Sequence, residues 1–300
     1  SLTGKKINLE FVSANPTGPL HLGHTRWAAV GDSLGRVLTA AGAQVSREFY
    51  VNDRGNQMDL FGQSLRAAAL EIAIPENGYH GEYIVDLASQ ITKANPTFTK
   101  LAEAESVAAF RDTGYLLQLA EQQKVLENFG THFDTWFSER TLYENNFFDH
   151  TLDKLKSLGH VYVEDGATWL RTTDFGDDKD RVMIKSDGSF AYFASDSAYY
   201  ISKRERGFDL CIYMLGADHH GYVGRIKAMA ACAGDNPEDD VEILIGQMVK
   251  IIEGGQELKL SKRAGIIITM EELVEKVGKD AARYTLIRYP TDTPMVMDVD

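Results

Sequence analysis

The apolar positions near the start of the chain follow two different periods. Residues 6–12 are rich in large apolar and β-branched side chains and end at the turn sequence NPTGP, which predicts a buried strand. Over residues 24–41 the apolar positions recur every three or four residues, which predicts an amphipathic helix capped by Gly42. Residues 43–51 predict a second strand. A strand, a helix and a strand in this order predict a βαβ unit of a parallel sheet.

Further along the chain, residues 62–159 show long helical patterns with polar faces. Strands are expected in VYVEDGATWLRT and in RVMIKSDGSFAYFASD, where Asp187-Gly188 is a hairpin turn signal. A second βαβ unit follows, with FDLCIYML as strand, HHGYVGRIKAMAACAG as helix and VEILIGQMVKI as strand. After a hairpin-like turn and a basic loop, MEELVEKVG and KDAARYTLIRYP predict two helices.

Two βαβ halves separated by an insertion predict an α/β fold. We expect a split Rossmann-like, doubly wound parallel sheet with a mostly helical insertion and a short C-terminal helical extension. The expected division is 1–61 for the first half of the nucleotide-binding domain, 62–159 for the helical insertion, 160–255 for the second half and 256–300 for the basic loop and the extension.

Composition narrows the class of protein. Of 300 residues, 44% are hydrophobic and 25% are charged, which is typical of a soluble globular protein. No apolar run approaches the roughly 20 residues that span a bilayer, and the first residues contain no signal-peptide core. Cys211 and Cys232 form neither a disulfide framework nor a zinc cluster, which fits a reducing cytoplasm. The net charge of −13 argues against non-specific nucleic-acid binding but allows a local basic patch.

The sequence HLGH places His21 and His24 at the start of the first predicted helix. As metal ligands they would need further partners, and no cysteine–histidine spacing supplies them. One interpretation is a helix start with incidental histidines. The other is a phosphate site, because a helix N-terminus favours an anion and imidazoles can donate to phosphate oxygens. Gly23 would then let a ligand approach the backbone closely.

The stretch KLSKRAG supplies a second candidate element, with Lys259, Lys262 and Arg263 on a loop after the second βαβ unit. A short basic run is often only a solvated turn. Its place beyond a strand of the second half instead points to the crevice where such sheets bind ligands.

Together HLGH and KLSKR resemble the two signatures of class I aminoacyl-tRNA synthetases, with Leu260 where methionine is commoner. The segments LEFVSANPTGPLHLGHTRWAAVGDSLGRVL, FYVNDRGNQ, YMLGADHHGY and DAARYTLIR resemble, in the same order, the bacterial arginyl-tRNA synthetases. The resemblance covers nearly the whole chain. It implies that residues 62–159 are a connective region and that the last helices begin a region in contact with the tRNA stem.

The resemblance implies an arginine site. The residues concerned are Glu10, Asn15, Tyr192, Asp196 and Asp218. A carboxylate that accepts two parallel bonds suits a guanidinium, and a tyrosine ring can stack on it. Read without the resemblance, Glu10 could be a surface residue of an edge strand and Asp196 a helix N-cap.

The resemblance also implies an ATP site. The residues concerned are His21, Gly23, His24, Gly216, His220, Gly246 and Lys262, with His21, His24, Lys259 and Lys262 catalytic. Gly216 and Gly246 would give adenine flat access to the backbone. No resident metal site is expected, because adjacent His219 and His220 would point about 100° apart on a helix. The acidic stretch FGDDKDR is interpreted as a solvated hairpin end.

The implied reaction joins L-arginine and ATP to arginyl-adenylate, with Mg²⁺ on the leaving pyrophosphate, and transfers arginine to the 3′ end of tRNA(Arg). The expected protein is a cytoplasmic monomer with no membrane partner, and the chain is a catalytic core without the family's N-terminal and anticodon-binding domains. Two alternatives stay open: a nucleotidyltransferase of the same superfamily, and a non-catalytic paralogue that binds an amino acid or a nucleotide. A nicotinamide dehydrogenase is disfavoured, because no G-x-G-x-x-G follows the first strand.

Overall fold

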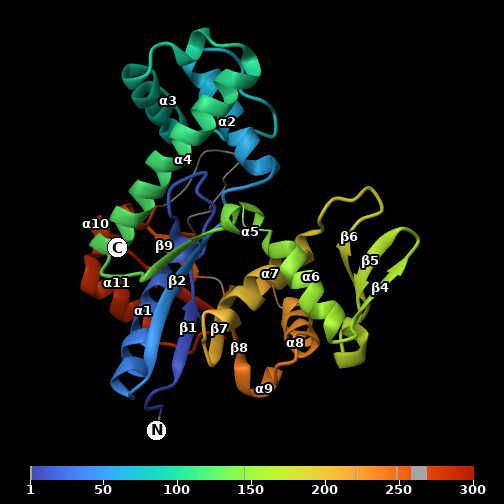
Figure 1. Cartoon of the computed structure of the whole chain (residues 1–300). Coiled ribbons are helices and arrows are strands. Elements are labelled where there is room, and N and C mark those ends of the chain that lie inside the picture. The colour runs from blue at the N-terminus through green and yellow to red at the C-terminus, as the bar shows by residue number, and fades with distance from the viewer. Residues whose placement is uncertain (1, 145, 220, 248, 258–268) are drawn as a thin grey trace.

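The computed structural model describes residues 2–144, 146–219, 221–247, 249–257 and 269–300, and its centre is a five-stranded parallel sheet (Figure 1). The strand order is β3-β2-β1-β7-β8. The bounds are β1 (Lys6–Glu10), β2 (Gln44–Val51), β3 (Thr135–Ser138), β7 (Leu210–Gly216) and β8 (Val241–Gly246). Winding proceeds outward from β1 to β3 on one side and through β7 to β8 on the other. The expected doubly wound sheet is confirmed, with its switch point between β1 and β7.

Helices cover both faces of this sheet. One side carries α1 (Leu22–Ala40), α10 (Met270–Val277) and α11 (Lys279–Ile287), and the other carries α6 (Phe147–Ser157), α7 (Tyr192–Glu205) and α8 (Tyr222–Cys232). Successive side chains of β2 show the two faces: Phe49 packs in the cluster of α1, whereas Tyr50 packs against that of α7. Because both faces are covered, the central strands β1 and β7 each contain four consecutive buried residues and show no alternation of buried and exposed positions.

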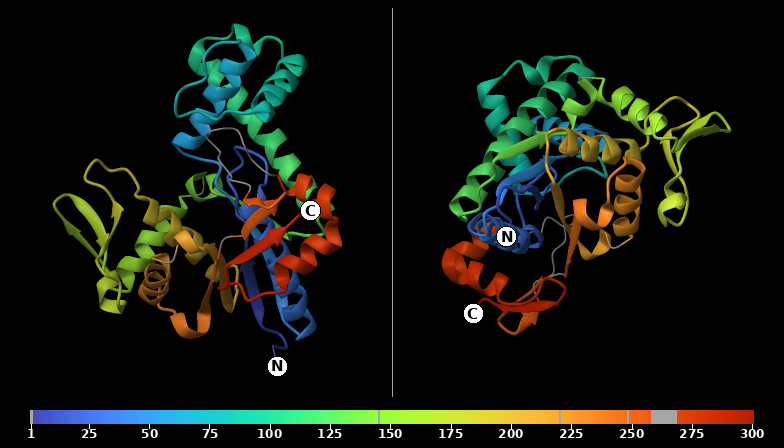
Figure 2. Two further views of the ribbon diagram at one scale, coloured as in Figure 1. Left: turned by 180° about the vertical axis from the view of Figure 1, so that it is seen from behind. Right: turned by 60° about the horizontal axis from the view of Figure 1, so that its bottom comes forward.

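The predicted insertion forms a helical unit, which consists of α2 (Asn56–Ala69), α3 (Glu82–Ala94), the short 3-10 helix η1 (Phe98–Lys100) and α4 (Glu103–Asn128). It has its own apolar core and extends away from the sheet in both views of Figure 2. Within the described residues, no helix is long and apolar enough to cross a membrane.

The predicted range 62–159 differs from this unit at both ends. The unit begins at Asn56, and the range also contains β3, which pairs with β2 in the main sheet, and α5 (Arg140–Glu144). Strand β3 has only the residues TWFS, all of them half-buried. So short a segment without alternation carries no strand signal.

Only the first part of the expected strand RVMIKSDGSFAYFASD forms a strand. That part is β6 (Arg181–Ile184), which joins β4 (Val161–Glu164) and β5 (Ala167–Leu170) in a separate antiparallel sheet. After the turn at Asp187 and Gly188, pairing is limited to a bridge between Ile184 and Phe190. The chain then enters α7, because apolar residues four apart pack together there on the main sheet. The remaining short elements are η2 (Thr172–Phe175), η3 (Ala217–His219) and α9 (Pro237–Asp240).

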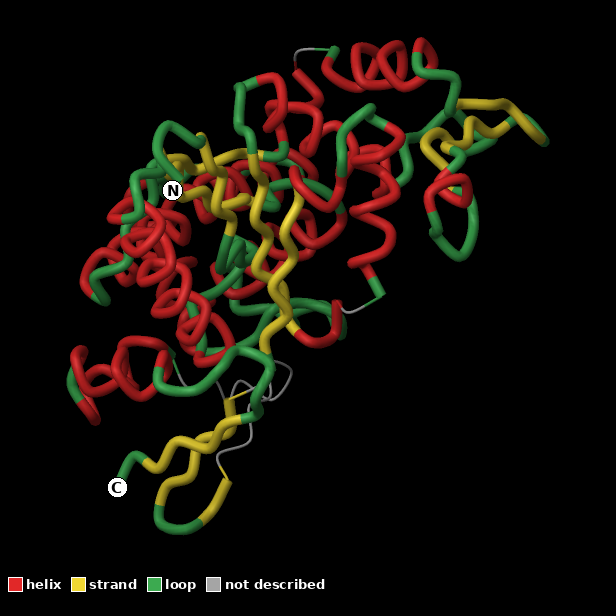
Figure 3. Tube along the Cα trace, turned by 90° about the horizontal axis from the view of Figure 1, so that it is seen from below, coloured by secondary structure: helices red, strands yellow, loops and turns green. Residues whose placement is uncertain are grey.

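The expected strand VEILIGQMVKI is two strands in different sheets. Strand β9 (Val249–Glu253) pairs with β10 (Gln256–Glu257) through the predicted turn and with β11 (Met295–Asp298) in parallel. This small sheet lies apart from the main sheet, near the C-terminus (Figure 3). The C-terminal extension is therefore not only helical, because pairing with β9, far away in sequence, makes β11 a strand.

A buried arginine joins α1 to this extension. Arg26, only 3% exposed, donates to the carbonyl oxygens of Gln247 and Thr293 at 3.0 Å and to that of Pro290 at 2.8 Å. One guanidinium therefore provides donors for three backbone carbonyls that come from two separate segments.

We expect Arg26→Met to lower the free energy of unfolding by about 2–4 kcal/mol, because it removes three hydrogen bonds that contribute roughly 0.5–1.5 kcal/mol each. Urea unfolding measures this. Arg36→Met is the matched control on the same helix: its side chain is 58% exposed, and the buried carboxylate of its partner Asp32 keeps a bond from Arg283, so its loss should cost less than about 1 kcal/mol. Equal losses in the two variants would contradict the assigned role of Arg26.

Candidate active site

A cleft of about 680 Å³ opens at the carboxyl edge of the parallel sheet. Asn52 and Arg54 follow β2, Glu139 follows β3, and Tyr192 and Asp196 belong to the first turns of α7. The remaining lining residues are Tyr50, Gly55, Asn56, Gln57, Tyr143, Lys185, Ser189, Phe190, Ala191 and Ser195. The volume is in the usual range for small-molecule sites, and the place is where such sheets bind ligands.

The two arginine-site candidates on α7 both face this cleft. Tyr192 is 92% exposed, so its ring is available to a ligand, and Asp196 follows one turn later. Asp196 is not the helix N-cap, because Ala191 occupies that position. No local pattern in the sequence indicates Glu139, whose carboxylate faces the same cleft and accepts a hydrogen bond from Tyr50.

Both cleft carboxyl groups have raised pKa values. Desolvation inside the cleft raises the pKa of Asp196 to about 7; the charges of Glu139 and Glu10 add to this, and Arg225 opposes it. The side chain of Asp196 is exposed to solvent and lines the cleft. Desolvation and Asp53 likewise raise the pKa of Glu139, against the charge of Arg54. When desolvation and neighbouring negative charges raise the pKa of a carboxyl group, a cationic ligand stabilises its ionised form.

Glu10 lies at the carboxyl end of the central strand β1, so it is not a surface residue of an edge strand. Its Oε2 accepts from Lys203 Nζ at 2.6 Å and its Oε1 accepts from Ser13 Oγ at 3.2 Å. Lys203 is fully buried, with its ammonium over the rings of Tyr199 and Tyr213. Both oxygens of Glu10 already accept a hydrogen bond, so Glu10 is less suited to accept two bonds from a guanidinium. The cleft carboxylates Asp196 and Glu139 are better suited to such a bidentate bond.

The two histidines build the start of α1. His21 is its N-cap: His21 Nδ1 accepts from the amide of Gly23 at 3.1 Å, and His24 Nδ1 accepts from the amide of His21 at 3.2 Å. Because both Nδ1 atoms accept from backbone N–H groups, the neutral rings carry their protons on Nε2. Their ring centres lie 3.9 Å apart. The pair therefore presents N–H donors at a helix N-terminus, where an anion is favoured.

At two of the candidate glycines, Gly23 and Gly246, a side chain would collide with a neighbouring ring. A Cβ on Gly23 would lie 2.9 Å from the ring of His21, so the glycine lets that ring fold over the helix start. Gly216 and Gly246 face each other at the carboxyl ends of β7 and β8. A Cβ on Gly246 would meet the indole of Trp27 at 2.2 Å, so a side chain of α1 fills that space.

The remaining candidates are less closely grouped. Asn15 and His24 line a separate small cavity of about 50 Å³, not the cleft. Lys259, Lys262 and His220 lie outside the described residues, as does the side chain of Asp218. The first described residue after the basic loop, Thr269, forms a β-bridge with His21. The described chain therefore resumes directly beside the histidines.

The stretch FGDDKDR is not simply a solvated hairpin end. Arg181, at 8% exposure, donates to Asp177 through Nε at 2.7 Å and NH2 at 2.6 Å. The ion pair buries one of the acidic side chains that composition alone suggested would face water.

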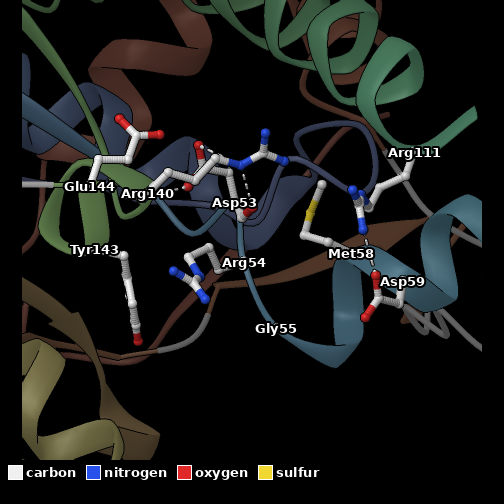
Figure 4. A pocket seen from close by; sticks show the side chains of 9 residues that line it. All are labelled: Asp53, Arg54, Gly55, Met58, Asp59, Arg111, Arg140, Tyr143 and Glu144. Atoms are coloured by element: carbon white, nitrogen blue, oxygen red, sulfur yellow. Dashed lines mark hydrogen bonds and ion pairs between the residues drawn. The ribbon is translucent and has the colours of Figure 1, made fainter. Parts of the chain in front are cut away.

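A second cavity of about 450 Å³ shares Arg54, Gly55 and Tyr143 with the cleft (Figure 4). Arg54 stacks on the ring of Tyr143 with its Cζ 3.3 Å from the ring centre. Two further arginines point into the cavity, but Arg111 bonds to Asp59 and Arg140 to the backbone of Asp53. The charges of Arg111 and Arg140 are therefore paired within the protein.

Residues 1–290 match the family model of class I (R) tRNA synthetases, catalytic domain. The chain belongs to this family. It is 55% identical over 298 residues to an arginine–tRNA ligase of Kineococcus radiotolerans, covering 99% of this chain and 54% of that protein. The arginine–tRNA ligase of Renibacterium salmoninarum is 52% identical with the same coverage.

Solved structures agree with this family. A Campylobacter jejuni structure assigned as an arginyl-tRNA synthetase has a TM-score of 0.90 at 37% identity, covering 99% of this chain and 67% of that one. The Thermus thermophilus arginyl-tRNA synthetase shares the fold, with a TM-score of 0.75 at 16% identity over 98% of this chain and 60% of that one. The chain spans about half the length of the curated relatives it matches.

We expect the affinity of the cleft for a cationic amino acid such as L-arginine to increase from pH 5.5 to 8, by close to tenfold per unit below the pKa of Asp196, about 7. Below that pH the ligand must displace a proton. In the free protein, a carboxyl pKa raised above its unfolded value makes stability fall as pH rises from about 4 through 7.

Titration calorimetry at pH 6 in buffers of different ionisation enthalpy measures the proton released, which should approach one per ligand. Asp196→Asn removes most of the release. Binding without proton release at pH 6 would contradict a role for this carboxyl group.

Proposed function

We propose that the protein activates L-arginine with ATP and transfers it to tRNA(Arg), and that this chain carries the catalytic core. The observation that carries the proposal is the cleft at the carboxyl edge of the sheet, where Asp196 and Glu139 meet with raised pKa values. Two such carboxylates favour the side chain of arginine, a planar cation with five N–H donors.

In this proposal Asp196 accepts from the guanidinium, assisted by Glu139, and Tyr192 stacks on it from the mouth of the cleft. Glu10 adds negative charge from beneath while its oxygens stay with Lys203 and Ser13. The resemblance to the family assigns Asn15 to the α-amino group and adds Asp218 to the arginine site.

The nucleotide belongs beside the start of α1. The Nε2–H groups of His21 and His24 donate to the α and β phosphates, and adenine lies near the strand ends at Gly216 and Gly246. Gly23 lets the His21 ring fold over the helix start, so that both imidazoles lie beside the phosphates. Lys259, Lys262 and His220 lie outside the described residues and keep the ATP-binding and catalytic roles that the family resemblance implies.

The chemistry needs positioning more than covalent help. The carboxylate oxygen of arginine attacks the α-phosphorus in line, an arginyl-adenylate forms, and pyrophosphate leaves with the bonding electron pair. Imidazole donors and the N-terminus of α1 stabilise the charge that accumulates on the phosphates. In the second step a ribose hydroxyl of the tRNA attacks the carbonyl carbon, and AMP leaves.

In the proposed reaction Mg²⁺ is bound by the substrate ATP. Among the described residues no group of three or more histidines, cysteines or acidic residues is arranged to hold a metal ion. We therefore place Mg²⁺ on the phosphates of ATP and assign it no protein ligand. A monomer in the cytoplasm is the setting that the family resemblance favours.

Ligand-dependent stability tests the substrate assignment without tRNA. A ligand at about 100 times its Kd adds roughly 2.7 kcal/mol to the free energy of unfolding. We expect this from L-arginine and from ATP, and not from L-lysine or L-glutamate. Stabilisation by ATP alone would support a nucleotidyltransferase instead, and stabilisation by neither ligand would contradict the proposal.

His24→Ala separates catalysis from arginine binding. We expect arginine-dependent ATP–pyrophosphate exchange, measured with tRNA(Arg) present, to fall about 10²–10³-fold, since this is typical for the loss of one transition-state donor. The Kd for arginine should stay within about twofold. Equal losses in both quantities would show that His24 does not act on the phosphates.

A further inference from the structure

The turn that leads into the histidines cannot satisfy its own carbonyl groups. It comprises residues 15–19, and Pro16 and Pro19 have no backbone N–H to donate. In the described part of the chain, the carbonyls of Asn15, Thr17 and Gly18 take their donors from side chains of the helical unit.

One donor is Tyr83 of α3. Its hydroxyl donates to the carbonyl of Thr17 at 3.1 Å. Burial raises the pKa of this phenol above its ordinary value, so the hydroxyl keeps its proton. A Cβ on Gly18 would lie 3.3 Å from the same oxygen, so the absence of a side chain there lets the tyrosine approach.

The other donor is Gln122 of α4, which is fully buried. Its Nε2 donates to the carbonyl of Asn15 at 3.0 Å and to that of Gly18 at 2.8 Å. Its Oε1 is buried without a hydrogen-bond partner among the described residues. Since a buried unpaired acceptor is unfavourable, an apolar residue would suit this position better unless the two carbonyls needed the amide.

The same turn lies directly against His24. Asn15, Thr17, Gly18, Pro19 and His24 line one small cavity with Tyr79 and Tyr83. Its volume of about 50 Å³ is no more than one or two water molecules occupy in the liquid. The helical unit therefore reaches the histidine turn itself.

We propose that Tyr83 and Gln122 are positioning residues: through them the helical unit holds the turn 15–19 and so sets Asn15 and His24 for the amino acid and the nucleotide. This inference rests on the proposed function for the identity of the two ligands. Both side chains act through backbone carbonyls, so each can be changed without removing a group assigned to substrate.

Tyr83→Phe removes one hydroxyl and keeps the ring, and Gln122→Met keeps the size of the side chain and removes its amide. Tyr79→Phe is the matched control, because Tyr79 lines the same cavity and, among the described residues, its hydroxyl donates no hydrogen bond to the turn. The measurements are calorimetric Kd values for ATP and L-arginine, and hydrogen exchange of the Thr17, Gly18 and Leu20 amides, with the amides of β7 as an internal reference.

We expect Tyr83→Phe to weaken ATP binding roughly fivefold, the usual worth of one hydrogen bond, and Gln122→Met to weaken it more. Exchange in the turn should accelerate in both variants while that of β7 does not, and Tyr79→Phe should match the wild type. Acceleration everywhere, as from general destabilisation, would overturn the inference.

The two proposals fail in different ways. If the wild type binds ATP and arginine and the Tyr83 and Gln122 variants bind both within twofold, the positioning role is wrong and the proposed function stands. If the wild type binds neither ligand, the proposed function fails, and turn exchange equal to that of Tyr79→Phe would then reject the positioning role as well.

Discussion

Two ion pairs, each with one fully buried partner, decide where helix α7 lies against the sheet. Lys203 bonds to Glu10 of β1, and Arg206, which follows α7, bonds with both terminal nitrogens to Glu48 of β2. Lys203 and Glu48 are fully buried, and Tyr199 also donates to Glu48 at 2.6 Å. Removing one partner of such a pair typically costs about 3–5 kcal/mol, because the other charge stays buried. The helix therefore has one favourable position.

That position builds the cleft. The charged residues near the end of α7 hold the helix, so that its first turns place Tyr192 and Asp196 opposite the ends of β2 and β3. The other half of the candidate site is held differently. There the turn before α1 rests on neutral hydrogen bonds from α3 and α4. The cleft thus depends on buried charge, and the turn before α1 depends on contacts with the helical unit.

The sequence predicted best what local patterns determine. The βαβ units, the helix start at His21 and the helical character of the insertion all follow from periodicity and turn residues, and the family resemblance added Tyr192 and Asp196. Glu139 is not predicted as a site residue, because it follows β3. That strand has four half-buried residues and forms only by pairing with β2. The stretch up to Asp196 is predicted as a strand throughout. The contacts that make its last residues helical are with the main sheet, and they leave no local pattern in the sequence.

Other contributors were hidden because their roles are tertiary. Gln122 lies on a helix whose buried side includes Ser106, Gly114 and Gln118, so no apolar stripe marks that face. Lys203 is a lysine buried at 0% exposure, which composition assigns to the surface. Neither position has a local signal, because the partner that explains each one is more than a hundred residues away in sequence.

If the cleft carboxylates select a guanidinium, the ratio of the Kd for L-citrulline to that for L-arginine should depend on them. Citrulline keeps the shape of arginine and lacks its charge. We expect Asp196→Asn to lower this ratio by about 10–100-fold, mainly through weaker arginine binding, as for the loss of a charge-assisted bond. The control is Asp153→Asn, at an exposed carboxylate on α6, which should leave the ratio unchanged. If the Asp196→Asn protein kept the wild-type ratio, this carboxylate would not select the guanidinium.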